Sequence, residues 1–295
     1  MALTSILLGL TAALCWGTAD YLSRRQSEKV GSYKAVVYSH LATLLVLLAL
    51  VPILTPSLSV PPNASLALLA AGLVNFMAFI FLYRAFHRGV VSVVAPVAYT
   101  YPAVTAVLSV LILGTVIAST RVLAISGIIL GVVLLSTRFS ELKKYLDGRG
   151  APNITAGVGS AIGSSFFFGA VYIGVGYAAP LVSFVLPALF LRAVGAGAGF
   201  ALAPLLRQDV RPSRSAFSNT IIAMGVLEAA GFLTFIYGIT GGGGSLPVVT
   251  ALSGMGGAVA ATYAMVFLRE RLERNQVVGI FLSLAGVFTL LYLGG

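Results

Sequence analysis

The chain has 295 residues, a formal net charge of +10, 59% hydrophobic and 9% charged residues, and a mean hydropathy of +1.02. A soluble domain of this length needs a larger share of polar residues, so the composition excludes that class and predicts a polytopic membrane protein. The single cysteine, Cys15, excludes a disulfide framework within the chain and a cysteine metal site, and we expect no metal and no cofactor.

Apolar stretches of about 20 residues, each long enough to cross a bilayer as a helix, recur along the whole chain. The first one lacks a preceding basic region and a clear cleavage site, so we interpret it as a spanning helix and not as a cleaved signal peptide. The predicted fold is therefore an all-α integral membrane protein with ten transmembrane helices. These helices cover residues 3–23, 32–54, 63–86, 90–113, 120–137, 153–178, 181–206, 217–239, 243–268 and 275–293.

The second half of the chain repeats the first. Residues 83–121 align without a gap on residues 237–275, at an offset of 154, and each half holds five predicted helices. Because five is an odd number of crossings, the second half must enter the membrane in the opposite orientation. Inverted five-helix repeats of this kind are typical of alternating-access transporters. We therefore divide the chain into a first repeat over residues 1–137, a polar linker over 138–152 and a second repeat over 153–295.

The basic residues are distributed unevenly between the predicted loops. Sixteen of them lie in or beside odd-numbered loops, and Arg121 alone lies on the side of the termini. We predict that the chain lies in the plasma or inner membrane of the cell. Basic residues accumulate in cytoplasmic loops, so we also predict that both termini lie outside the cytoplasm. The positive charge is thus explained by topology, and we expect no nucleic-acid partner.

Two motifs carry a resemblance to a known family. Trp16-Gly17-Thr18 ends the first helix, and Arg269-Glu270-Arg271-Leu272 precedes the last helix with Gln276 and Gly279. Together with the inverted repeats, they resemble the EamA-type branch of the drug/metabolite transporter (DMT) superfamily. That family usually has Gly in place of Arg269, and Val116 replaces the motif's Glu in the first repeat. The resemblance implies a central cavity lined by helices 1–4 and 6–9, but it implies no substrate.

The same resemblance implies that helices 5 and 10 lie at the periphery. Gly127 and Gly131 form a GxxxG motif in the fifth helix, and such motifs let membrane helices approach closely. We therefore expect that helices 5 and 10 could join two copies of the chain in a homodimer.

Ionisable residues inside membrane helices are costly, so each is a candidate for function. His40 and Arg192 occupy equivalent positions in the two repeats, and so do Asn75 and Glu228, which predicts that all four face the interior. The alternatives are a structural Arg192–Glu228 ion pair, a snorkelling Arg192 and a hydrogen-bonded interior His40. Asp20, near the end of the first helix, either lines the cavity or pairs with Arg24 or Arg25.

Helices 4 and 9 contain the helix breakers expected of cavity-lining segments. Pro96 interrupts helix 4 and Gly241–Gly244 opens helix 9, so we expect both to bend there. Tyr99 and Ser253 are superposed by the offset of 154, and they either line the cavity or only pack between helices. The predicted aromatic walls are Tyr83, Tyr99, Tyr101, Tyr172 and Tyr237.

We predict a secondary transporter that exports a small polar metabolite such as an amino acid, because Glu228 beside Arg192 and His40 suits a zwitterion. Glu228 is also the candidate proton-coupling residue. The alternative is a choline-like quaternary-amine or drug transporter, since aromatic rings attract cations. From another class, a membrane-embedded lipid-handling protein or enzyme remains open, although we expect no catalytic site. The candidate substrate-binding residues are Trp16, Asp20, His40, Asn75, Tyr83, Tyr99, Tyr172, Arg192, Glu228, Tyr237 and Ser253.

Overall fold

The computed structural model describes residues 2–55, 58–89, 94, 97–137, 139–148, 154–241, 245–268 and 273–294, and these residues form helices and no β-strand. The first-repeat helices are α1 (Ala2–Val30), α2 (Ser32–Leu54), α3 (Pro62–Arg88), α5 (Tyr101–Leu113) and α6 (Ser119–Ser136). The linker contains α7 (Phe139–Leu146). The later helices are α8 (Ile154–Ala178), the 3-10 turn Ala179–Leu181, α9 (Leu186–Leu202), α10 (Asn219–Thr240), α11 (Leu246–Ser253), α12 (Gly256–Leu268) and α13 (Arg274–Gly294).

Five described helices are long and apolar enough to cross a membrane. They span Leu3–Val30, Ser32–Leu54, Pro62–Arg88, Gly157–Leu181 and Asn219–Thr240. Four further apolar helices are shorter, at Tyr101–Leu113, Ser119–Leu134, Leu186–Leu202 and Leu246–Ala260. The structure is thus that of a helical membrane protein, and the count of ten crossings stays a prediction.

The first helix is longer than its apolar stretch. α1 continues past residue 23 to Val30, because the polar residues after the apolar run still form helical hydrogen bonds and an ion pair one turn apart. Arg24 Nε lies 3.3 Å from Glu28 Oε1 in that last part. The apolar stretch therefore marks the membrane-spanning part of the helix and not its end.

The predicted fourth and ninth helices are both interrupted near the middle. α5 begins only at Tyr101, with Pro102 in its first turn, and Gly254 and Met255 separate α11 from α12. At the offset of 154, Tyr101 is equivalent to Met255, so the two interruptions are related by the repeat. Pro96 and Gly242–Gly244, the bending points expected from the sequence, lie outside the described residues.

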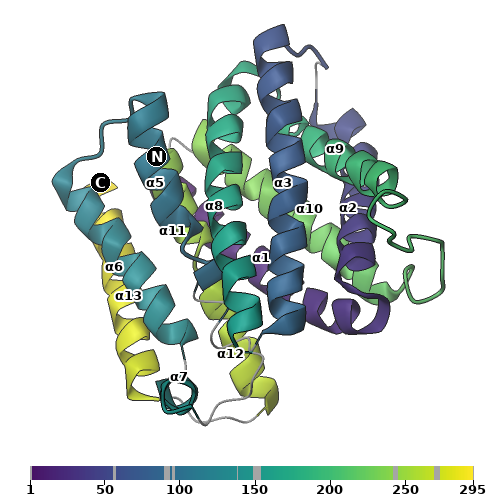
Figure 1. Cartoon of the computed structure of the whole chain (residues 1–295). Helices are drawn as coiled ribbons and strands as arrows, with labels where there is room; N and C mark the ends of the chain where they lie inside the picture. The colour runs from purple at the N-terminus through teal and green to yellow at the C-terminus, as the bar shows by residue number, and fades with distance from the viewer. Residues whose placement is uncertain are drawn as a thin grey trace.

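The helices pack in pairs that join the two repeats (Figure 1). α3 packs along α8, α1 along α10, and α6 along α13 at one edge of the bundle. A Cβ on Gly131 would lie 2.6 Å from Ser283 N and 2.8 Å from Gly279 O, so only glycine permits this approach of α6 to α13. The small-residue face of α6 is thus used within the chain. A homodimer through the outer faces of α6 and α13 stays a prediction.

The N-terminal end of α1 and the C-terminal end of α13 lie at the same end of the bundle (Figure 1). The linker helix α7 lies at the opposite end, where α3 also ends. This arrangement is what an even number of crossings requires. The side that faces the cytoplasm stays a prediction based on the basic residues.

Candidate functional site

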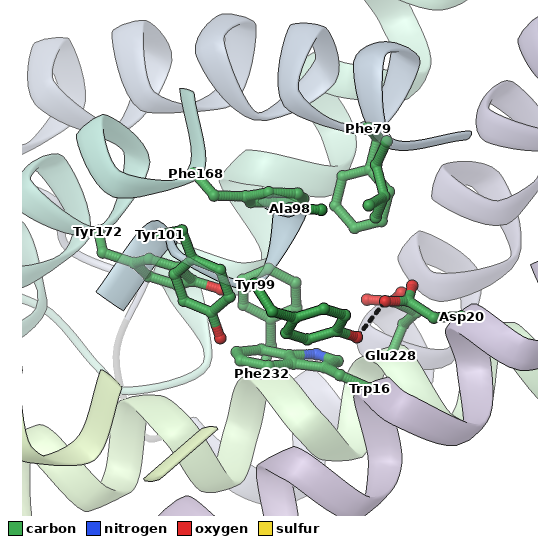
Figure 2. A pocket seen from close by; sticks show the side chains of 11 residues that line it. Trp16, Asp20, Phe79, Ala98, Tyr99, Tyr101, Phe168, Tyr172, Glu228 and Phe232 are labelled. Carbon is green, nitrogen blue, oxygen red and sulfur yellow. Dashed lines mark hydrogen bonds between the residues drawn. The ribbon is translucent and has the colours of Figure 1, made fainter. Parts of the chain in front are cut away.

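A cavity lies between α1, α3, α8, α10 and the residues that precede α5 (Figure 2). Both repeats contribute to it. Its empty space is about 410 Å³, but the closely packed side chains leave only about 30 Å³ for the centres of water molecules, room for about two of them. The cavity is lined by Trp16, Asp20, Phe79, Leu82, Ala98, Tyr99, Tyr101, Phe168, Tyr172, Glu228 and Phe232.

Helical spacing explains why each helix supplies two lining residues. Trp16 and Asp20 are four residues apart on α1, and α8 and α10 contribute their pairs, Phe168 with Tyr172 and Glu228 with Phe232, at the same spacing. Residues at i and i+4 lie on the same helix face, one turn apart. One face of each helix therefore forms a wall of the cavity.

The Arg192 guanidinium is enclosed directly behind this cavity. Its Nη2 lies 2.6 Å from Glu228 Oε2, and the two side chains are 0% and 2% exposed. Its Cζ lies 4.6 Å from the ring centroids of both Phe79 and Phe232. An ion pair buried this deeply needs such close partners to offset the desolvation of two charges. Arg192 thus pairs with Glu228 in this structure, and only Glu228 of the two lines the cavity.

His40 completes the partners of Arg192. Its Nδ1 lies 3.0 Å from the carbonyl oxygen of Val36, and its Nε2 lies 3.2 Å from Arg192 Nη1. Because the carbonyl accepts a hydrogen, we assign the proton to Nδ1, which leaves the Nε2 lone pair to accept from Arg192. His40 is therefore neutral in this arrangement. His40 and Arg192, which occupy equivalent positions in the two repeats, are therefore also in direct contact with each other.

Asn75 lies fully buried beside these groups. Its amide group lies beside the His40 ring, although neither the amide nitrogen nor the amide oxygen forms a hydrogen bond of ordinary geometry with the described residues. Buried amide groups normally find partners, and an unpaired one is costly. Asn75 thus adds a further polar group to the buried cluster of His40, Arg192 and Glu228.

Asp20 faces the cavity and is 7% exposed. It accepts a short hydrogen bond from the Tyr99 hydroxyl group, and Arg24, one of the partners expected from the sequence, pairs with Glu28 instead. Figure 2 shows the carboxyl groups of Asp20 and Glu228 close together on one side of the cavity. The Arg192 guanidinium pairs with Glu228 and no described residue forms an ion pair with Asp20, so the site has one uncompensated negative charge when both carboxyl groups are ionised.

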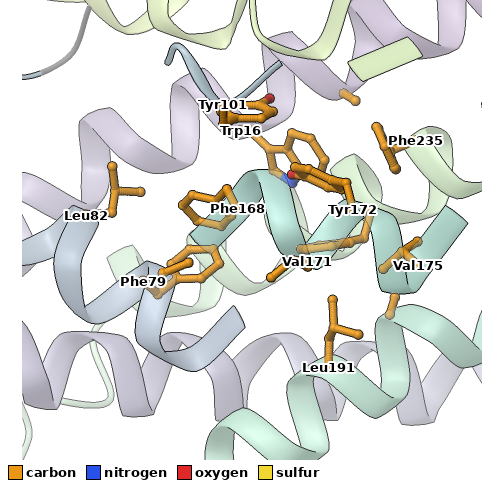
Figure 3. Close-up of a cluster of buried hydrophobic side chains, with 14 of the residues drawn as sticks. Trp16, Phe79, Leu82, Tyr101, Phe168, Val171, Tyr172, Val175, Leu191 and Phe235 are labelled. Carbon is orange, nitrogen blue, oxygen red and sulfur yellow. The ribbon is translucent and has the colours of Figure 1, made fainter. Parts of the chain in front are cut away.

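Aromatic rings form most of the remaining wall (Figure 3). The Trp16 ring centroid lies 5.1 Å from that of Phe232 and 6.1 Å from that of Tyr172. The rings of Tyr101 and Tyr172 are 5.3 Å apart, and Tyr101 Oη lies 3.2 Å from Ser253 Oγ. The cavity therefore combines an aromatic cage with the carboxyl groups of Asp20 and Glu228 on one side.

The structure brings most of the predicted site residues together. Among them, the cavity-lining residues are Trp16, Asp20, Tyr99, Tyr172 and Glu228. Arg192, His40 and Asn75 lie behind the lining, and Ser253 reaches the site through Tyr101. Tyr83 is buried, with its hydroxyl group 3.4 Å from Ser39 Oγ. Tyr237 is 45% exposed and packs on Phe184, so it does not reach the cavity.

Several lining residues were missing from the predicted set. Phe79 and Phe232 are related by an offset of 153, and Trp16 and Phe168 by an offset of 152. The same repeat alignment that singled out the polar residues pairs these aromatic residues as well. Applied to aromatic residues, it would have found them from the sequence.

A sequence model of the EamA-like transporter family matches residues 3–137 and 155–292. The chain therefore belongs to the EamA family of the DMT superfamily, a transporter family with two repeats per chain. Its Glu270-Arg271-Leu272 motif lies outside the described residues. Among solved structures, one described only as the crystal structure of a protein is 18% identical, covers 98% of both chains and has a TM-score of 0.77. That likeness supports the fold alone. A comparison with curated proteins found no match.

Proposed function

We propose that the chain is a secondary transporter of a small organic cation, a primary or quaternary amine, which it moves by alternating access between its two repeats. The observation that carries this proposal is Asp20, whose carboxyl group borders a cage of aromatic rings while Arg192 is already paired with Glu228. A desolvated cation over such rings is stabilised by about 2 kcal/mol. The carboxylate adds a charge-assisted hydrogen bond to a primary ammonium group, or charge attraction alone to a quaternary one, which has no N–H to donate.

The charge of the site supports coupling to protons. Asp20 and Glu228 together need two positive charges, and Arg192 supplies one. Either a proton or a substrate cation supplies the other, so the two compete and exchange. Glu228 keeps its proposed role as a proton-coupling residue, and Asp20 shares it because it lines the same cavity. Entry of a proton would then drive export of the amine.

An amino acid, the substrate that the sequence favoured, is a second candidate with one supporting observation. Its carboxylate needs a hydrogen-bond donor, and the indole Nε1–H of Trp16 is buried without a partner in the described part of the chain. Arg192 does not fill this role while it pairs with Glu228. The ammonium group would occupy the same place beside Asp20 in either case.

The test is transport by the purified chain in liposomes with an imposed pH gradient. An amino acid and the amine that remains after removal of its carboxyl group form a matched pair of substrates. We expect the amine to be exchanged for protons, and to be bound with higher affinity than the matched amino acid. Preference for the amino acid would favour the second candidate, and transport of neither with no change on imposing the gradient would contradict the proposal.

A further inference from the structure

A second, larger hollow lies at the end of α3, between α2 and the segment that follows α9. Its volume is about 840 Å³. Tyr33 of α2, Leu206 and Gln208 form one side, and Arg84, His87 and Arg88 of α3 form the other. We call it the α3 groove. It lies at the end of the bundle that also holds α7, away from both termini (Figure 1).

The α3 groove carries uncompensated positive charge. Arg84 and Arg88 lie one helical turn apart, are exposed, and form no ion pair with any residue that the structure describes. The described lining of the groove includes no Asp or Glu. A hollow with two guanidinium groups that lack an acidic partner among the described residues attracts an anion. Each guanidinium group can donate two parallel hydrogen bonds to two oxygens of one phosphate group.

The acidic residue of the neighbouring hollow, Asp209, already has a basic partner. Asp209 Oδ2 lies 3.3 Å from Lys34 Nζ, and both line a neighbouring hollow. The backbone N–H of Arg211 and the Lys34 side chain hold the pKa of Asp209 below its usual value. Asp209 therefore stays ionised and compensates Lys34, and the charge of the α3 groove is left for a ligand.

The surface that leads to the groove is apolar. On α3 the residues that precede Arg84 on the same face recur every three or four positions, which keeps them on one side of the helix. Four of the five are exposed on the bundle surface, and Leu206 is exposed on the opposite side of the groove. An apolar face that ends in two arginines matches the order of parts in a phospholipid. The residues of this face are Leu66, Leu69, Leu73, Met77 and Ile80.

We propose that the α3 groove binds an anionic phospholipid of the adjacent leaflet. Arg84 and Arg88 contact the phosphate group, Gln208 contacts the rest of the headgroup, and the acyl chains lie along the apolar face of α3. Basic pockets between membrane helices hold anionic headgroups in this way. The site is distinct from the central cavity and does not depend on which solute is transported.

The test measures the thermal stability of the purified full chain in detergent. Phosphatidylglycerol, phosphatidylcholine and soluble glycerol phosphate are each titrated against three proteins: the unaltered chain, R84Q/R88Q and R211Q/R214Q. The last variant is the matched control, because it removes the same two charges from exposed positions of the α9–α10 segment outside the groove.

We expect phosphatidylglycerol to raise the melting temperature of the unaltered chain, because a ligand that binds only the folded state stabilises it. The phosphatidylglycerol concentration that gives half of the maximal rise in melting temperature should increase about tenfold in R84Q/R88Q and less than twofold in R211Q/R214Q. The reason is that only the first variant loses the bidentate contacts with the phosphate group. If R84Q/R88Q does not fold, the single variants R84Q and R88Q are compared with the single control variants R211Q and R214Q in the same titrations.

Three results would overturn the proposal. Equal losses in both double variants would mean that the lipid responds to surface charge in general. An equal response to phosphatidylcholine would mean that the headgroup charge is not recognised. An equal response to glycerol phosphate would make the groove a site for a soluble phosphate and not for a lipid. None of these measurements depends on transport, so failure here leaves the proposed function untouched.

Discussion

The two repeats build the same cavity wall but carry charge differently. Trp16 is equivalent to Phe168, and Phe79 to Phe232, so aromatic residues line the cavity on both sides. At the next equivalent position the repeats diverge, because Asp20 of the first repeat corresponds to Tyr172 of the second. The aromatic frame is thus symmetric, whereas the two carboxyl groups beside it, Asp20 from the first repeat and Glu228 from the second, occupy positions that are not equivalent. Of the two, only Glu228 is paired with Arg192.

The polar network behind the cavity shows the opposite bias. The first repeat contributes neutral His40 and Asn75, and the second contributes Arg192 and Glu228, which neutralise each other. The charges of the second repeat therefore compensate each other as long as they are paired, whereas the Asp20 carboxyl group of the first repeat has no cationic partner among the described residues. Residues that are equivalent in the two repeats thus mark where the cavity lies, and positions where the repeats differ supply its charged groups.

The largest expected effect concerns the membrane topology of the two repeats, and the reporter signals that test it should be either present or absent. Reporters placed before α1 and after α13 should both be active only outside the cytoplasm, because sixteen basic residues lie in or beside the odd-numbered loops. A cysteine that replaces Lys144 in α7, in a chain with Cys15 changed to Ser, should be labelled only from the cytoplasmic side. Cytoplasmic reporters at both ends would contradict the predicted topology.

The second effect is on stability and makes the second repeat resemble the first. Arg192→His leaves the Glu228 carboxylate buried without its partner, and breaking a buried ion pair in this way costs about 3–5 kcal/mol. The double variant R192H/E228N places the first-repeat residues in the second repeat, and it should recover part of the loss because no unpaired charge remains. The free energy of unfolding in mixed micelles gives both values. If the double variant is less stable than R192H, the unpaired Glu228 carboxylate is not the cause of the stability loss in R192H.

The third effect tests the carboxyl group of Asp20, which is replaced by Tyr172 at the equivalent position of the second repeat. Asp20→Asn removes the carboxylate at nearly constant volume, and loss of a charged hydrogen bond of about 1.5–3 kcal/mol weakens amine binding by about 10- to 100-fold. Tyr172→Phe at the equivalent position is the control and should change binding less than threefold. Binding is measured by ligand-dependent thermal stabilisation. Equal losses in the two variants would place the amine elsewhere in the cavity.

The smallest effect concerns Tyr99, which joins the interrupted helices to α1. Its hydroxyl group donates to Asp20, and its ring lies on α12, where a Cβ on Gly257 would be 2.7 Å from Tyr99 Cγ. Because that hydroxyl group occupies Asp20 in place of a ligand, Tyr99→Phe should tighten amine binding about two- to tenfold, the equivalent of one hydrogen bond. Tyr101→Phe removes a hydroxyl group that contacts Ser253 and not Asp20, so it should leave the affinity unchanged. Weaker binding by Tyr99→Phe would mean that the hydroxyl group contacts the ligand.

The sequence by itself determined the class of the protein and the repeat. Apolar stretches, basic loops and the offset between the halves are local or periodic properties, and hydropathy acts on each segment separately. For that reason the EamA family and the helical membrane fold were predicted correctly. The same alignment also placed His40 and Arg192 in equivalent positions, since repeated segments adopt the same local structure.

Only the tertiary structure decided how the polar groups pair. Arg192 lies 36 residues from Glu228 and 152 from His40, and Tyr99 lies 79 residues from Asp20, so each contact depends on how separate helices pack. Packing also interrupts the ninth helix at Gly254 and Met255 and turns Tyr237 away from the cavity. Hydropathy cannot predict such features, because a spanning helix is apolar on both its lipid-facing and its interior sides, and the direction of each face is fixed only by the neighbouring helices.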